Sequence, residues 1–138
     1  MSAKQNTKIL RKAMEEYNKG NFEAFYEIYA PNHVFISGGE ELKGKQAFVD
    51  LDKTVRNAFP DSQYTIEDVI EKDDKVVWRE TFRGTFSGNF RSMTPTGNKV
   101  VLPAIVIHRF ADGKIVETWV ERDNLSMLQQ MGIIKPRG

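Results

Sequence analysis

The chain of 138 residues contains no cysteine and only two histidines. Without cysteine it can form no disulfide, has no thiol nucleophile and offers no thiolate to a zinc ion. Two histidines are too few for a metal site rich in imidazole, and His33 follows a helix exit, where we expect it to be exposed. The sequence therefore predicts a protein without a metal site.

The chain also lacks long apolar runs and any excess of one charge. No run approaches the ~20 residues that span a bilayer, and the first residues lack the apolar core of a secretory signal. Twenty basic and nineteen acidic residues, mixed along the chain, give a formal net charge of +1, without a basic stretch for nucleic acid. We expect a cytoplasmic protein that binds neither membranes nor nucleic acid, with a small molecule or a second copy as its partner.

Helical periodicity is found in the first half of the chain and at its end. Apolar residues recur at three- and four-residue spacing in 3–19 and 45–58. A short aromatic helix lies between Asn21, which caps it, and Pro31, which ends it. A last helix, 125–131, follows Asn124 as its cap. Three helices are thus predicted before the long strands and one after them.

The second half of the chain has the two-residue period of β-strands. Residues 64–71 and 75–85 predict a hairpin, 33–37 a short strand, and 100–123 a long two-stranded ribbon. Helices grouped ahead of antiparallel strands are typical of the α+β class. We predict a single domain, 1–138, in which a cone-shaped, curved antiparallel sheet wraps around the N-terminal helices.

The ribbon 100–123 is the segment richest in candidate functional groups. It turns at Asp112 and Gly113, and an uninterrupted ladder from this turn places His108 opposite Glu117. One face of the ribbon then carries the polar and aromatic residues His108, Glu117, Trp119, Glu121 and Asp123. We expect this face to line a site.

The opposite face of the same ribbon is apolar. Such a face is too large to stay in water, and a symmetric second copy is the simplest way to cover it. We therefore expect a homodimer that pairs through a sheet face formed by Ile105, Ile107, Val116 and Val120.

Short motifs in a fixed order run along almost the whole chain: Phe59-Pro60-Asp61, Arg79, Gly84-Thr85, Gly88, Pro95-Thr96-Gly97, Gly113-Lys114-Ile115, Trp119, Asp123 and Leu128-Gln129-Gln130-Met131-Gly132. Their order and spacing resemble the SnoaL-like polyketide cyclases. The resemblance implies the nuclear-transport-factor-two-like α+β cone, which is usually dimeric through its sheets. Periodicity alone predicts the same cone and the same dimer.

The resemblance also implies an intramolecular aldol ring closure on a polyketide ester, without a metal or other cofactor, and with an acidic general acid/base. Asp123 stands at the position of that acid, four residues after Trp119. A carboxyl group at the dry end of an apolar cone has a raised pKa, which suits proton exchange with carbon near neutral pH. We expect His108 to polarise or orient a substrate carbonyl and Glu121 to act as a second acid.

A cone rich in aromatic residues would suit a flat hydrophobic ligand. We expect ligand contacts from Trp119, Trp78, Tyr17, Tyr26, Phe35, Phe59 and Phe86. Structural alternatives exist: the aromatic side chains can be core, Asp123 can cap a helix or pair with an arginine, and His108 can bond Glu117 inside the core.

Three functions remain open on the sequence. The first is cofactor-free acid/base chemistry, ring closure or isomerisation, on a hydrophobic carbonyl compound. The second is a non-catalytic ligand-binding or dimeric scaffold domain, which Phe86, Thr118 and Val120 favour because many family members carry polar residues there. The third is water addition as in relatives of limonene epoxide hydrolase, for which Glu121 and Asp123 would share one water.

Overall fold

A computed structural model describes residues 2–135 of the protein. Its helices are α1 (Ala3–Asn18), α2 (Phe22–Tyr26), α3 (Lys45–Ala58) and α4 (Asn124–Met131). Its strands are β1 (Tyr29–Ser37), β2 (Glu40–Lys43), β3 (Gln63–Lys72), β4 (Lys75–Thr85), β5 (Lys99–Ala111) and β6 (Lys114–Arg122).

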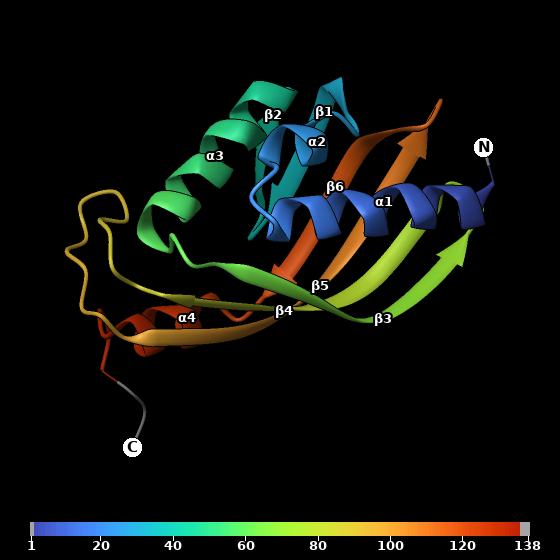
Figure 1. Cartoon of the computed structure of the whole chain (residues 1–138). Helices are drawn as coiled ribbons and strands as arrows, with labels where there is room; N and C mark the ends of the chain where they lie inside the picture. The colour runs from blue at the N-terminus through green and yellow to red at the C-terminus, as the bar shows by residue number, and fades with distance from the viewer. Residues whose placement is uncertain (1, 136–138) are drawn as a thin grey trace.

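The six strands form one curved sheet in the order β2-β1-β6-β5-β4-β3. Figure 1 shows α1, α2 and α3 together on one side of this sheet, while α4 lies near the far end of β5. The predicted α+β cone around the N-terminal helices is therefore confirmed. The sheet departs from the prediction in one pairing, because β1 and β6 run parallel and only the other neighbours are antiparallel.

The helices begin and end close to where the sequence predicts. Ser2 and Gln5 form a capping box at the start of α1, and α3 has the predicted bounds. The aromatic helix α2 is shorter than expected, because Tyr29 already belongs to β1. None of the helices in 2–135 is long and apolar enough to cross a membrane.

The expected exposure of His33 is wrong. His33 is fully buried, since β1 starts before Pro31 and its alternation turns His33 and Phe35 toward the helices. Pro31 is tolerated because the pairing of β1 with β6 shifts register between Tyr29 and Val34, where no ladder hydrogen bond is required of it.

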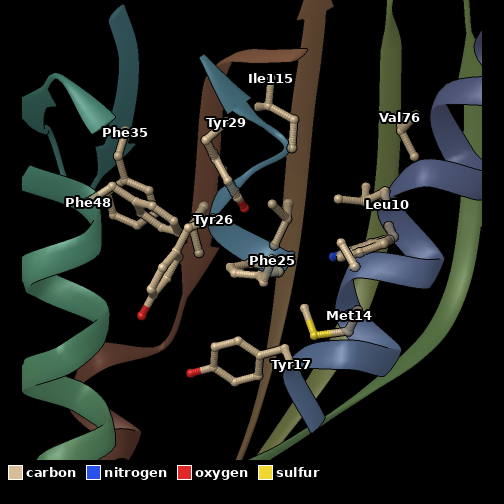
Figure 2. Close-up of a cluster of buried hydrophobic side chains, with 14 of the residues drawn as sticks. Leu10, Met14, Tyr17, Phe25, Tyr26, Tyr29, Phe35, Phe48, Val76 and Ile115 are labelled. Atoms are coloured by element: carbon tan, nitrogen blue, oxygen red, sulfur yellow. The ribbon is translucent and has the colours of Figure 1, made fainter. Parts of the chain in front are cut away.

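The main hydrophobic core lies between the sheet and the three N-terminal helices. Figure 2 shows Leu10 and Met14 of α1 and Phe48 of α3 pointing into this core from opposite sides. A second cluster lies toward the end of the sheet that carries α4, and it includes Phe59, Phe86 and Met131. The cone thus has two apolar regions, one under the helices and one near α4.

The ribbon formed by β5 and β6 turns as predicted but pairs differently beyond the turn. Asp112 and Gly113 both have positive φ, 52° and 76°, as a type I′ turn requires, and Phe110 pairs with Ile115. Beyond that pair the register shifts, so that Arg109 pairs with Glu117 and Val116 is an extra residue in β6. This β-bulge interrupts the ladder that the sequence predicts.

A shift of one residue exchanges the two faces of β6. His108 pairs with Thr118 instead of lying opposite Glu117, and its face of the ribbon continues through Val120 to Arg122 inside the cone. Trp119 and Glu121 point to the outer face instead. The predicted set of polar residues sharing one face is therefore wrong, and so is the predicted place of Val120 on the outer apolar face.

Candidate functional site

The cone contains two adjoining chambers. The inner one, of about 90 Å³, lies under the helices, and the outer one, of about 410 Å³, opens toward α4 and the loop between β4 and β5. Residues common to both walls form the neck between them: Phe35, Leu51, Val55, Tyr64 and Arg122. The outer chamber is mainly apolar, with side chains that include Phe59, Phe82, Phe90, Met93, Leu102 and Met131.

Polar side chains of the inner chamber stand on three adjacent strands. Glu80 of β4, Ala104 of β5 and Arg122 of β6 lie side by side in one row across the sheet. Glu80 and Arg122, on either side of the small Ala104, both line the inner chamber. His108 and Thr118 form a second polar pair four residues further along the strands.

Glu80 is the buried carboxyl group of this chamber, with 7% of its surface exposed. Its Oε1 accepts a hydrogen bond of 3.0 Å from the indole Nε1 of Trp78, and Oε2 has no hydrogen-bond donor among residues 2–135. Burial raises the pKa of Glu80, while the Trp78 hydrogen bond and the nearby charge of Arg122 partly oppose that rise. Glu80 is thus a carboxyl group poised to hold or release a proton.

His108 is buried in the chamber wall, edge-on to Trp78. Burial lowers its pKa to about 4, so the ring is neutral near pH 7. Its Nδ1 lies 3.1 Å from the carbonyl oxygen of Val76, which can only accept, so Nδ1 carries the proton and Nε2 has a free lone pair. His108 can therefore accept a hydrogen bond from a ligand hydroxyl or enol.

A second acidic residue, Asp52 of α3, also lines the inner chamber. Its Oδ1 accepts from the Tyr17 hydroxyl at 2.8 Å, and its Oδ2 accepts from the Tyr26 hydroxyl at 2.5 Å and from Arg56 at 3.1 Å. Burial, together with the carboxylate, raises the pKa of both tyrosines, which keeps them as donors. Asp52 is engaged by three donors and ties α3 to α1 and α2.

The sequence-predicted ligand residues divide into two groups. Tyr17, Trp78 and Phe35 line the inner chamber, and Phe59 and Phe35 line the outer one. Three others are absent from both walls: Tyr26, Phe86 and Trp119. The Tyr26 hydroxyl bonds Asp52 and Arg56, Phe86 is buried behind Phe59, and Trp119 lies on the outer face.

The predicted catalytic residues are not brought together. Only His108 lies in the inner chamber, and the expected bond between His108 and Glu117 is wrong because Glu117 pairs with Arg109. Asp123 is exposed, and its Oδ1 accepts from the backbone N–H of Ser126 at 2.9 Å, so Asp123 caps α4 in place of the predicted Asn124.

Glu121 is exposed on the outer face of β6. Glu121 and Asp123 therefore both lie outside the inner chamber and share no water site there with His108. The condition for a catalytic role of Asp123, a carboxyl group turned into one cavity with His108, is not met.

The sequence interpretation missed three chamber residues, Glu80, Arg122 and Asp52. Glu80 has a usable signal, because it follows Val76 and Trp78 at two-residue spacing on a strand whose alternate residues are buried. Asp52 stands four residues after Phe48 on the apolar side of its helix. Arg122 has no such signal, since its direction depends on the bulge at Val116.

Among residues 2–135, no group of three or more histidine, aspartate or glutamate side chains is arranged to hold a metal ion. The chamber instead combines a carboxyl group, a neutral imidazole and a guanidinium group in an apolar wall. Such a set can transfer protons and bind an anion or a carbonyl compound.

An α+β cone with a pocket between a curved sheet and helices defines the class of nuclear-transport-factor-two-like proteins. The model of the SnoaL-like polyketide cyclase family matches residues 7–131, and the chain belongs to this family. No curated protein matches the chain.

Solved structures agree with this assignment. AclR of Streptomyces galilaeus, a proposed hydroxylase, is 25% identical with a TM-score of 0.88, over 99% of this chain and 87% of that one. IdmH of Streptomyces antibioticus, a proposed polyketide cyclase, is 28% identical with a TM-score of 0.79, and the match covers 93% of this chain and 99% of IdmH. A SnoaL-like protein of Jannaschia sp. CCS1 is 21% identical with a TM-score of 0.86, and the match covers 97% of this chain and 95% of that one. This likeness supports the fold.

The raised pKa of Glu80 predicts a pH dependence of stability. The folded protein keeps the Glu80 proton to higher pH than the unfolded chain, so this residue makes stability fall as pH rises above 4.5. Glu80→Gln should remove that contribution, so that in urea titrations its unfolding free energy rises more steeply than that of the wild type between pH 5 and 8. The exposed Glu121→Gln is the matched control, and equal slopes for wild type and Glu80→Gln would contradict the prediction.

Proposed function

We propose that the protein binds a hydrophobic carbonyl compound in the cone and performs cofactor-free acid/base chemistry on it, ring closure or isomerisation. The observation that carries this proposal is Glu80, a buried carboxyl group with one engaged and one free oxygen in a chamber. Membership of the SnoaL-like polyketide cyclases and the likeness to IdmH support this chemistry. Glu80 takes the place of Asp123 as the proton carrier.

In the proposed ring closure, ionised Glu80 removes a proton from the carbon next to a ligand carbonyl. The C–H bond breaks, an O–H bond forms on Glu80, and the electron pair moves into an enolate. The enolate carbon then attacks a second carbonyl of the same ligand, and the resulting alkoxide takes the proton back from Glu80. A raised pKa makes the carboxylate a stronger base for the first step.

His108 has a different role from the one that the sequence predicts. A neutral imidazole that donates from Nδ1 to Val76 cannot also donate from Nε2 to a carbonyl. We propose that Nε2 accepts a hydrogen bond from a hydroxyl or enol of the ligand and thereby orients it. His108→Phe would remove this acceptor while keeping a ring against Trp78.

The two alternative functions fit the chamber less well. Water addition needs two available acids around one water, but Tyr17, Tyr26 and Arg56 already donate to Asp52, which leaves Glu80 as the available one. A non-catalytic binding domain would not need a carboxyl group with a raised pKa in its pocket.

The proposal is tested with 2-tetralone, a hydrophobic ketone whose acidic C–H protons exchange with deuterium in D₂O. The wild type should accelerate this exchange, measured by proton NMR, and Glu80→Gln should lower the acceleration by about 10²-fold or more, the usual contribution of a general base. Glu121→Gln should retain it. Binding of 2-tetralone without any acceleration by the wild type would favour the non-catalytic alternative.

We also propose that the outer sheet face pairs with a second copy. Val101 and Ile105 are 48% and 53% exposed there, beside Ile107 and Trp119. This set replaces part of the predicted one, because Val120 lies inside the cone. Light scattering should give the mass of a dimer at micromolar concentration, and Ile105→Lys should shift it toward the monomer. A wild-type monomer would refute the pairing.

A further inference from the structure

Arg122 stands at the neck between the two chambers and belongs to the wall of both. It is the last residue of β6, and its row across the sheet turns it inward beside Ala104. Its Nε is buried and has no hydrogen-bond partner within the part of the chain that the structure describes. A buried guanidinium donor without an acceptor is costly, because desolvation of a charged donor is not repaid.

The protein supplies little to neutralise this charge. Among residues 2–135, no carboxylate oxygen lies within 4.0 Å of Arg122. Glu80 is near enough for the charge of Arg122 to act on its pKa, but burial still leaves that pKa raised. Tyr64, another neck residue, also has its raised pKa partly lowered by Arg122. The positive charge thus lies close enough to two residues of the chamber wall to act on both of them.

We infer that Arg122 is an anion-binding residue and that the ligand is an amphipathic acid whose carboxylate or enolate oxygen binds the guanidinium. The inference rests on the proposed function, because it assigns the ligand class of the same chamber. A planar guanidinium presents paired N–H donors that match a carboxylate, and such charge-assisted bonds are strong in an apolar surrounding.

The two chambers fit the two parts of such a ligand. The outer chamber of about 410 Å³ has the size and the apolar wall of a small-molecule site and takes the hydrophobic body. The inner chamber of about 90 Å³ admits only a few atoms. With the anionic group held at the neck, an adjoining carbonyl-bearing part of the ligand enters the inner chamber, whose wall includes Glu80.

The test compares 4-(1-naphthyl)butanoate with its primary amide, which has nearly the same shape but no charge. Isothermal titration calorimetry at pH 7 should show the acid binding the wild type at least tenfold more tightly than the amide. Arg122→Met, which keeps a long apolar side chain, should lose this preference while binding the amide unchanged. Arg79→Met is the matched control on the outer face of β4 and should keep the preference.

Equal affinity of acid and amide for the wild type would overturn the inference and leave the pocket function standing. A tenfold preference that survives Arg122→Met would also overturn it, because the charge would then come from another residue. Binding of neither compound would count against the inference and against the proposed pocket alike. The wild-type comparison needs no variant, so the inference stays falsifiable if Arg122→Met fails to fold.

Discussion

Acidification from pH 7 to 5 is expected to destabilise the protein by about 2 kcal/mol for each of its two buried histidines. Burial lowers the pKa of both His33 and His108 from 6.5 to about 4. The unfolded chain therefore binds a proton at each imidazole in this range and the folded protein does not, so protons favour unfolding. Together the two residues remove about 4 kcal/mol, a large share of a typical stability of ~5–15 kcal/mol.

The surroundings of His33 explain why it stays neutral. Its Nε2 lies 2.8 Å from the hydroxyl of Thr118, and aromatic rings of Tyr29 and Phe48 pack against it. Its Nδ1 is buried and has no hydrogen-bond partner among the described residues. No carboxylate within 4.0 Å, among residues 2–135, stabilises a charged form. Protonation would place an unpaired charge in the core.

Urea titrations at several pH values measure this effect. His33→Gln or His108→Gln should each reduce the proton uptake on unfolding between pH 6.5 and 4 by about one. Val76→Ala is the control, because it weakens the same core without removing a titratable group. If either histidine variant kept the wild-type slope, that imidazole would be charged in the folded protein.

Gly88→Ala is expected to lower the free energy of unfolding by about 3 kcal/mol or more. A Cβ at this position would lie 2.0 Å from the backbone oxygen of Asn57, which cannot move without disturbing the end of α3. The backbone N–H groups of Ser87 and Gly88 both donate to the Ala58 oxygen, at 3.0 and 3.1 Å. Separating the two segments would cost these bonds as well.

The consequence for function is a change in the outer chamber. The loop between β4 and β5 lies beside the end of α3 (Figure 1), and it supplies Phe90, Arg91 and Met93 to the chamber wall. Gly88→Ala should therefore also weaken binding of 4-(1-naphthyl)butanoate by at least tenfold, measured by calorimetry on protein that remains folded.

Gly97→Ala is the matched control in the same loop. Its added Cβ would meet no atom of residues 2–135 within 4 Å, so the positive φ of 78° is what opposes it, at a cost of about 1–2 kcal/mol. The melting temperature of Gly88→Ala, measured by thermal unfolding, should be well below that of Gly97→Ala. The reverse order would mean that the loop does not rest on α3 as described.

Periodicity was sufficient to predict most of the elements, because each depends on neighbours in sequence. The helix 45–58 and the strand 75–85 have the predicted bounds, and the Asp112–Gly113 turn forms. Asp68 also faces Arg79 across β3 and β4 and forms an exposed ion pair with it, as a tight turn at Asp73 and Asp74 implies. Local sequence contains the information that such features need.

The side of the sheet to which each residue of β6 points could not be predicted in the same way. That prediction assumes that side chains alternate along the whole strand without a β-bulge. One extra residue, Val116, turned Trp119 and Glu121 outward and brought Thr118 and Arg122 into the cone. The composition of β6 gives no sign of that bulge. The predicted catalytic group therefore lost Glu121 and Asp123 and retained His108.

The sequence by itself determined the class of fold, the family and the absence of thiol chemistry, since these follow from composition, period and ordered motifs. Only the tertiary structure decided which acid belongs to the chamber. Glu80 is distant in sequence from His108 and Arg122, and the three become neighbours because β4, β5 and β6 pair with a particular register. Burial in that arrangement then changes their proton affinities, which no local pattern encodes.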